Sequence, residues 1–323
     1  MRIAILGAGG IGGYYGGVLA RAGHDVHVLA RGTNLAALRQ KGLEIRTPEE
    51  SFVVQVKAGD DVKQFGSVDW AIVAVKTYSL AEVGAAARYL AERGATMVPL
   101  LNGVDIADRL VELGVPEENV IGGLTTISAV RTGPGIFERR GKFQQVVLGE
   151  FTDAKLSQTK DLVRSGRVER IAEAFRQAGA DTRVSTDIRT DLWRKFAFIA
   201  PMAAACGLSR TPIGPLRATP LGRPLLERGI REVIAVGRAR GIPLGDEDLD
   251  RIMKFSDALP ETNKPSLLVD LEAGRLTEIE DLSGAVSRMG RELGVETPIH
   301  DTAVAAIGAA SAVAAAAGVS RAS

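Results

Sequence analysis

Three glycines near the start of the chain have the spacing of a phosphate-binding turn. Gly7, Gly9 and Gly12 form the pattern G-x-G-x-x-G directly after the apolar run Ile3–Leu6. In such a turn the first glycine lets the chain leave a strand sharply, the second lets a pyrophosphate approach bare backbone, and the third lets the next helix pack closely on the strand. The N-terminus of that helix would offer free N–H groups and a positive dipole end to the phosphates.

The surrounding sequence strengthens this interpretation, because a lone glycine pattern also joins elements that bind nothing. A predicted helix follows the turn through Ala20, Gly23 ends it, and the apolar segment Val26–Leu29 forms a second strand. The order strand, turn, helix, strand is typical of a dinucleotide-binding unit. We therefore predict that the cofactor binds along the turn, at Gly7, Ala8, Gly9, Gly10, Ile11 and Gly12.

The residues after the second strand indicate which dinucleotide is bound. Asp or Glu at this place usually bonds the ribose 2′-hydroxyl of NAD, whereas a nearby Arg accommodates the 2′-phosphate of NADP. The sequence here is Ala30, Arg31 and Gly32, without an acid. We therefore predict NADPH with Arg31 at its 2′-phosphate. The alternative is that Arg31 is an ordinary loop cation.

Two polar residues follow the next predicted strands. Lys76 comes after the apolar run Asp69–Val75, and Asn102 comes after Thr96–Leu101. In an open α/β sheet ligands bind beyond the carboxyl ends of the strands, so both residues are predicted to lie at the cofactor edge. An amide such as Asn102 can both donate to and accept from a carboxamide or a hydroxyl. A surface lysine and an Asn-Gly turn remain the alternatives.

A lysine within an apolar helical segment is the candidate proton donor. Lys195 lies in the predicted helix Leu192–Cys206, and its near neighbours on the C-terminal side are apolar. An ammonium group in such surroundings is unfavourable unless it has a task or a carboxylate partner. Glu278 is the candidate partner and the second predicted catalytic residue, although the sequence alone does not prove the pairing.

The predicted secondary structure that positions these residues changes once along the chain, from alternating strands and helices to helices alone. Strands and helices alternate up to the predicted strand Asp181–Val184, which is typical of a parallel α/β sheet. From Asp187 onward every predicted element is a helix. We therefore predict a Rossmann-type doubly wound α/β domain over residues 1–186 and an all-α substrate and catalytic domain over residues 187–323. The later predicted helices are Leu221–Arg240, Asp246–Phe255, Ser266–Glu272, Glu278–Leu293 and one that begins at Thr302.

Composition excludes several other classes of protein. With 40 basic and 39 acidic residues the net charge is +1, which gives no reason to expect nucleic acid or an anionic membrane as partner. The single Cys206 fits a reducing cytoplasm, and three scattered histidines do not predict a metal site. The chain enters a strand at once, and the alanine-rich segment Thr302–Val319 is predicted to be a packed helix rather than a membrane span. We expect a cytoplasmic protein that acts on a small molecule, and a homodimer stays possible.

Several motifs together resemble the ketopantoate reductase family, the 2-dehydropantoate 2-reductases. They are, in order, GAGGIGGYYG, VKTY, LLNGV, LWRKF, and the late segment from Asn263 through KPSLLVDL to LTEIEDLSG. The resemblance implies NADPH-dependent reduction of a 2-oxo acid to a 2-hydroxy acid, with 2-dehydropantoate of pantothenate biosynthesis as the expected substrate. It also implies roles for individual residues: Lys195 as general acid, Asn102 beside nicotinamide and substrate, Asn263 and Ser266 as substrate ligands, Glu278 near Lys195 and the cofactor, and Ala129 against the nicotinamide.

The sequence departs from the family pattern at two positions. The family's lysine helix usually presents asparagines four and eight positions after the lysine, where this chain has Ile199 and Ala203. A more apolar 2-oxo acid or another carbonyl substrate is therefore an alternative, as is a related dehydrogenase working in the oxidative direction. A non-catalytic NADP-binding regulator is a third alternative. It is disfavoured by four polar residues that a regulator does not need: Lys195, Glu278, Ser266 and Asn263.

Overall fold

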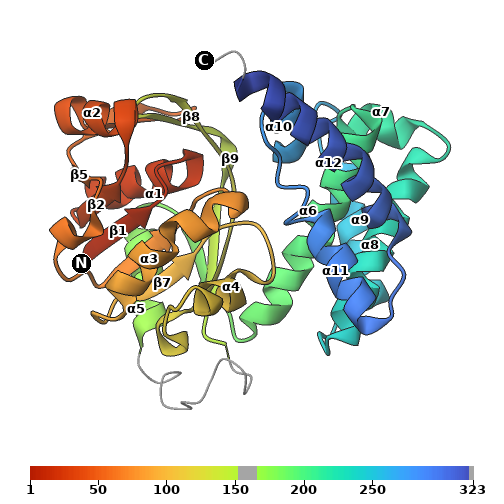
Figure 1. The fold of residues 1–323 in the computed structure, drawn as a ribbon, viewed down its shortest axis with the longest axis horizontal. Helices are drawn as coiled ribbons and strands as arrows, with labels where there is room; N and C mark the ends of the chain where they lie inside the picture. The colour runs from red at the N-terminus through yellow and green to blue at the C-terminus, as the bar shows by residue number, and fades with distance from the viewer. Residues whose placement is uncertain (152–165, 320–323) are drawn as a thin grey trace. The chain divides into compact units, whose positions relative to one another are not determined.

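The chain forms two compact units in a computed structural model that describes residues 1–151 and 166–319. The first unit comprises Met1–Leu101 and Asp105–Arg189, and the second comprises Asn102–Val104 and Thr190–Ser323. In Figure 1 the first unit, coloured red to light green, contains strands and helices, whereas the described part of the second unit contains helices only. The predicted boundary at residue 186 falls shortly before the division at Arg189.

A five-stranded parallel sheet forms the base of the first unit. Its order is β5-β2-β1-β6-β7, which is doubly wound around β1 (Figure 1). The strands are β1 (Arg2–Leu6), β2 (Asp25–Leu29), β5 (Lys57–Gly59), β6 (Trp70–Val73) and β7 (Thr96–Pro99). The four residues of β6 are all buried, which explains why this strand is a continuous apolar run without polar alternation. The predicted α/β fold class is confirmed for this unit.

A second sheet in the same unit was predicted only as separate strands and strand pairs, not as one sheet. It has the order β10-β9-β3-β4, with β8 paired antiparallel to β9. The hairpin that the sequence predicts from Leu43–Arg46 and Phe52–Lys57 is confirmed as β3 and β4, but residues 57–59 leave it and join β2 in the first sheet. The strands are β3 (Leu43–Arg46), β4 (Ser51–Val54), β8 (Gly122–Gly133), β9 (Ile136–Gly149) and β10 (Asp181–Val184).

Helix α1 (Gly10–Arg21) lies between the two sheets, and its glycines permit both contacts. A Cβ added at Gly16 would lie 3.2 Å from Ile5 of β1, on the side of the first sheet. A Cβ at Gly13 would lie only 2.2 Å from the ring of Phe137 in β9, on the side of the second. Because two sheets approach one helix so closely, Gly13 has no room for a side chain and Gly16 has little.

The other α-helices described in the first unit agree, except for one, with helices that the sequence predicts over Leu35–Lys41, Leu80–Arg93 and Val168–Ala178. They are α2 (Gly32–Lys41), α3 (Leu80–Ala91), α4 (Ile106–Glu112) and α5 (Arg167–Gln177), and α4 was not predicted. The helix α4 has only 7 residues, which is too short to show a clear apolar period.

The described residues of the second unit form helices around one apolar core. These are α6 (Ile188–Ser209, which starts in the first unit), α7 (Ile213–Ala218), α8 (Gly222–Ala239), α9 (Asp246–Ala258), α10 (Ser266–Glu272), α11 (Ser283–Leu293) and α12 (Pro298–Val319). The predicted helix Glu278–Leu293 was wrong at its start, because Glu278 lies in a turn before α11. Within the described residues, no helix is both long and apolar enough to cross a bilayer.

Candidate active site

The glycine turn has the conformation that its sequence predicts. Gly7 has φ +112°, a region that side chains rarely adopt, and an added Cβ would lie 2.7 Å from the Val75 nitrogen. At Gly12 an added Cβ would lie 2.1 Å from the carbonyl oxygen of Gly7, so the helix packs closely on the turn. These two positions therefore require glycine for different reasons.

Gly9 differs from its neighbours because space opens in front of it. The nearest heavy atom to an added Cβ there is the Ala74 oxygen at 3.8 Å. Gly9 is also the N-cap of α1, and no described side chain caps the helix. Free N–H groups at an open, glycine-lined helix start are what a pyrophosphate needs, so these residues fit a dinucleotide.

Two further predicted cofactor residues lie next to this turn. A Cβ at Gly10 would lie 2.1 Å from the carbonyl oxygen of Ala129 on β8, so these two residues are in contact. Lys76 directly follows Val75, which packs against Gly7, and its side chain is half-buried. The first unit thus brings the glycine turn, Lys76 and Ala129 together.

Arg31 is exposed immediately after β2 and forms the N-cap of α2. Its neighbour Gly32 has φ +54°, and helix α2 starts there. Within the described part of the chain, no side-chain partner of the Arg31 guanidinium is found. A cation beside the N-terminus of a helix is suited to bind a phosphate group in addition to the pyrophosphate at the glycine turn.

Asn102, Lys195 and Glu278 meet within the second unit. The Nζ of Lys195 donates a hydrogen bond to the Oδ1 of Asn102 at 3.0 Å. Asn102 belongs to this unit because residues 102–104 cluster with the helices rather than with the sheet. Glu278 is only 5% exposed, and its negative charge acts on Lys195. The second unit thus brings three of the predicted site residues together.

The protonation of Lys195 follows from two opposing causes. Burial lowers the pKa of its ammonium group to about 8, and the carboxylate of Glu278 raises that pKa and limits the fall. At pH 7 about nine-tenths of such a group is still charged. Lys195 is therefore a stronger acid than an ordinary lysine and is still protonated at neutral pH, which suits a proton donor.

Two predicted substrate ligands are not linked to this group by any described hydrogen bond. Asn263 is half-buried in the loop before α10, where its backbone N–H donates to Pro260 at 2.9 Å and its carbonyl accepts from Ile213 at 3.0 Å. Ser266 is exposed at the start of α10. Their proposed contacts with substrate therefore rest on the family resemblance.

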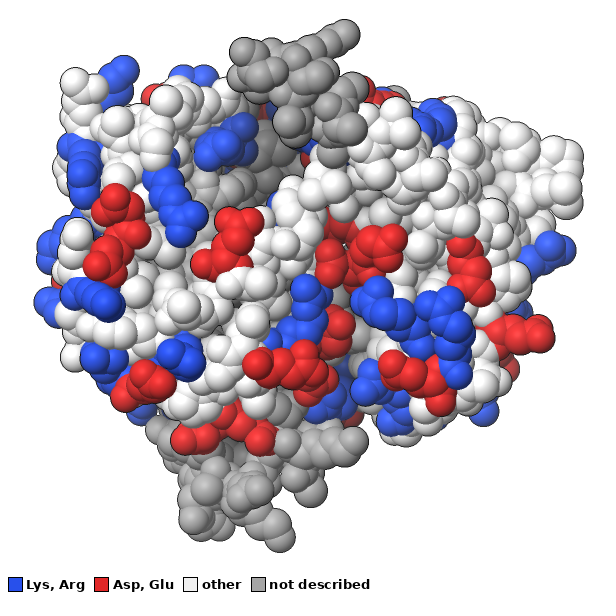
Figure 2. All heavy atoms as spheres, in the orientation of Figure 1, with Lys and Arg blue, Asp and Glu red and all other residues white. Residues whose placement is uncertain are grey.

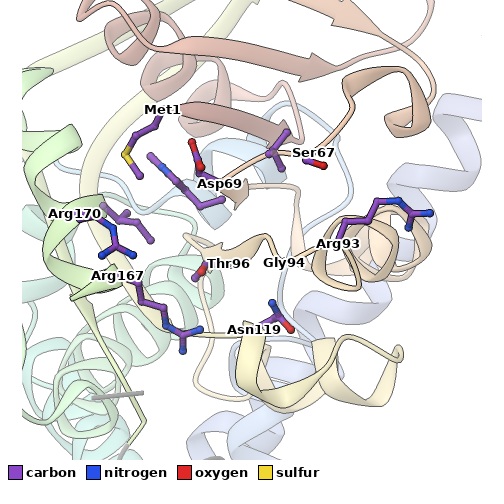
Figure 3. Close-up of a pocket in the computed structure, with 12 residues that line it drawn as sticks. Met1, Ser67, Asp69, Arg93, Gly94, Thr96, Asn119, Arg167 and Arg170 are labelled. Carbon is purple, nitrogen blue, oxygen red and sulfur yellow. The ribbon is translucent and has the colours of Figure 1, made fainter. Parts of the chain in front are cut away.

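A cavity of about 480 Å³ lies elsewhere in the first unit (Figure 3). Met1, Asp69 and Thr96 line it at the amino ends of β1, β6 and β7, opposite the edge that carries the glycine turn. Arg167 on its wall is paired with Glu150 through two contacts of 2.6 Å. Because none of the predicted site residues lines this cavity, we do not assign the cofactor to it.

Charges of both signs are mixed over the face drawn in Figure 2, without a broad patch of one sign among the described residues. Opposite charges also pair directly at the surface, as Arg223 does with Asp257 and Arg231 with Glu227, both at 2.9 Å. The expectation of a small-molecule partner is compatible with this surface.

Comparison with known proteins identifies the family. The model described as "Ketopantoate reductase PanE/ApbA" matches residues 3–153, and "Ketopantoate reductase PanE/ApbA C terminal" matches residues 187–311. The chain belongs to the ketopantoate reductase family. The predicted resemblance is thus confirmed, and the chain is an oxidoreductase of this family.

Individual family members resemble the chain over nearly its whole length. The 2-dehydropantoate 2-reductase of Halobacterium salinarum is 31% identical over 94% of this chain and 96% of that protein. A crystal structure of 2-dehydropantoate 2-reductase from Geobacter metallireducens has a TM-score of 0.85 and 31% identity, covering 96% and 100% of the two chains. A D-mandelate dehydrogenase solved with NADH and anilino(oxo)acetate shares the fold, with a TM-score of 0.86 at 24% identity over 97% and 99%.

Proposed function

We propose that this protein catalyses the NADPH-dependent reduction of a 2-oxo acid to a 2-hydroxy acid, with 2-dehydropantoate as the expected substrate. The observation that carries the proposal is the hydrogen bond between Lys195 and Asn102 in the presence of the Glu278 charge. This arrangement holds an ammonium group with a lowered pKa at a fixed place, which is the requirement for a general acid.

The chemistry divides between the cofactor and the residues of the second unit. The reduced nicotinamide, when bound, supplies the hydride that reaches the carbonyl carbon. Lys195 stabilises the negative charge that grows on the carbonyl oxygen and then donates its proton to that oxygen. Asn102 orients the amine through its 3.0 Å hydrogen bond, and Glu278 keeps the amine protonated. Proton donation of this kind contributes roughly a hundredfold to ten-thousandfold to the rate.

The preference for NADPH rests on Arg31. Its exposed guanidinium beside the start of α2 could bind the 2′-phosphate, which NADH lacks. The fold alone does not decide between the cofactors, because the D-mandelate dehydrogenase of similar fold was solved with NADH. Titration of the purified protein with NADPH and with NADH tests the assignment. At least tenfold tighter binding of NADPH supports it, and equal or tighter binding of NADH refutes it.

A second candidate is a more apolar 2-oxo acid, and the surface of α6 after Lys195 favours it. Phe198 and Ile199, three and four residues after Lys195, are half-buried on the same helical face. Ala203, one turn further along, lies in the apolar core beneath this face and adds no polar group. A substrate that extends from Lys195 along this face therefore meets hydrocarbon where a hydroxyl group would need a hydrogen-bond partner.

One pair of substrates separates the two candidates. 2-Dehydropantoate and 3,3-dimethyl-2-oxobutanoate differ only by one hydroxyl group. A site built to bind that hydroxyl rejects the analogue by about ten-thousandfold or more in kcat/KM, whereas a hydrocarbon surface discriminates by about a hundredfold at most. A strong preference for 2-dehydropantoate supports the first candidate, and a preference for the analogue supports the second.

Kinetic assays that follow NADPH in both directions of the reaction test the remaining alternatives. Faster turnover of 2-hydroxy acids with NADP than of 2-oxo acids with NADPH would favour the dehydrogenase working in the oxidative direction. Tight NADPH binding without turnover of any 2-oxo acid in a broad panel would favour the non-catalytic regulator and would refute the proposed reduction.

A further inference from the structure

We propose that Ser311 on α12 is a positioning residue that holds Glu278 beside Lys195. The inference rests on the proposed function, because it concerns the group proposed to donate the proton. Ser311 is separated from Glu278 by the whole of α11, so the sequence gives no local sign of this role.

The contact between α12 and the Glu278 segment is buried and specific. The Oγ of Ser311 accepts a hydrogen bond from the backbone N–H of Thr277 at 3.1 Å and another from the Oγ1 of Thr277 at 3.3 Å. Both residues are shielded from solvent, with Ser311 only 3% and Thr277 only 5% exposed. Thr277 directly precedes Glu278, so Ser311 fixes the backbone on one side of the carboxylate.

The other side of Glu278 is fixed by a turn and by the core. Its carbonyl oxygen accepts hydrogen bonds from the N–H groups of Asp281 at 3.1 Å and Leu282 at 2.9 Å. Ile279 and Leu282 are buried in the core of the second unit. The segment between α10 and α11 has no regular secondary structure, so it depends on such contacts for its shape.

Helix α12 is itself well anchored, which makes Ser311 a stable support. Glu232 of α8 accepts hydrogen bonds from the N–H groups of Ile299 and His300 in its first turn, at 2.9 and 3.1 Å. The ring of His300 is fully buried and bonds Ser283 at the start of α11 at 3.0 Å. Figure 1 shows α12 running alongside α11 within this unit, in agreement with their contacts.

The consequence of losing Ser311 follows from the causes that act on Lys195. Among the described ionisable groups, Glu278 is the one whose charge raises the pKa of Lys195, against the effect of burial. Without the Ser311 hydroxyl, the buried N–H of Thr277 has lost its acceptor, and the segment is expected to shift toward another one. A displaced Glu278 no longer opposes the effect of burial, so the Lys195 amine loses its proton at lower pH.

The experiment measures the ionisation of Lys195 without requiring turnover. Full-length wild type, Ser311→Ala, Glu278→Gln and the double variant are labelled with trace acetic anhydride across a pH series, and labelling of Lys195 is quantified by mass spectrometry. Ser287→Ala is the matched control, because Ser287 is a buried serine of α11 whose Oγ has no described partner. Ser311→Cys, which is close in size but a weak acceptor, serves as a second variant if Ser311→Ala does not fold.

We expect Ser311→Ala to lower the labelling pKa of Lys195 by about half a unit or more, in the same direction as Glu278→Gln. The double variant should match Glu278→Gln alone, because Ser311 acts through Glu278, and Ser287→Ala should match wild type. A Ser311 variant with an unchanged Lys195 pKa overturns the inference, as does a double variant in which the two shifts simply add. If the labelling pattern is the expected one but the protein reduces no 2-oxo acid, the positioning role is supported and only the proposed reaction is refuted.

Discussion

The pH dependence of the reduction is the most direct consequence of the surroundings of Lys195. Burial lowers the pKa of this amine from an ordinary 10.5 to about 8. The reaction needs the protonated form, so activity is present below this pKa and is lost as the pH rises through it. At pH 9 only about a tenth of the amine stays protonated, whereas an ordinary lysine would be almost fully charged.

The assay is kcat/KM for NADPH-dependent reduction of the best 2-oxo acid, measured from about pH 6 to about pH 10. Neither the substrate carboxylate nor the cofactor phosphates titrate between pH 8 and 10, so an alkaline loss of activity belongs to the enzyme. We expect a plateau that falls about tenfold per pH unit above pH 8. Glu278→Gln should move this fall to lower pH, because the charge that raises the Lys195 pKa is gone.

Lys195→Arg is the matched control for that profile. A guanidinium group stays protonated throughout this range, so the variant should be slow but should show no alkaline fall near pH 8. A wild-type profile that stays flat to pH 9.5, or a fall near pH 8 that persists in Lys195→Arg, would contradict the assignment of the proton donor.

Three further predictions concern the cofactor, the acid stability and the packing of α1. In fluorescence titration, Arg31→Ala should raise the Kd for NADPH about tenfold to a hundredfold, as expected for one lost bond to a charged phosphate. The Kd for NADH should stay unchanged. An equal change of both Kd values would contradict the 2′-phosphate contact. Burial lowers the pKa of His300 to about 4, so the native state resists its protonation. This residue should contribute about 3 kcal/mol to the loss of unfolding free energy as the pH drops from 6.5 to 4, and in urea titrations the pH dependence of His300→Gln should be smaller than that of wild type by this amount. Gly13→Ala should destabilise the protein by about 2 kcal/mol or more, because its Cβ would lie 2.2 Å from Phe137, and a melting temperature equal to wild type would disprove that tight contact.

The first half of the parallel sheet could be predicted because its signals are local. The glycine turn, the helix after it and the strand Val26–Leu29 each follow from a few adjacent residues. The second sheet as a whole could not be predicted, because the pairings that unite it join distant segments: β9 lies between β3 and β10. The ladder between β8 and β9 also shifts register after Ile127, so the alternating pattern of a regular hairpin is interrupted.

The residues of the candidate site could be singled out from the sequence, but their contacts could not. Lys195 stood out because an ammonium group is unusual in an apolar helix, yet its bond to Asn102 spans 93 positions and has no sequence signal. The start of α11 was misplaced because Glu278, Glu280 and Leu282 are good helix formers. Tertiary contacts, including that of Thr277 with Ser311, hold this segment as a turn instead.

The central claim is that the ammonium group of Lys195 protonates the reduced carbonyl oxygen, and Lys195→Met tests it most directly. The measurement is kcat on the best 2-oxo acid together with the Kd for NADPH, in wild type and variant. We predict that kcat falls at least about a hundredfold while the Kd changes by less than about threefold. A Lys195→Met variant that retains near-normal kcat would contradict the claim.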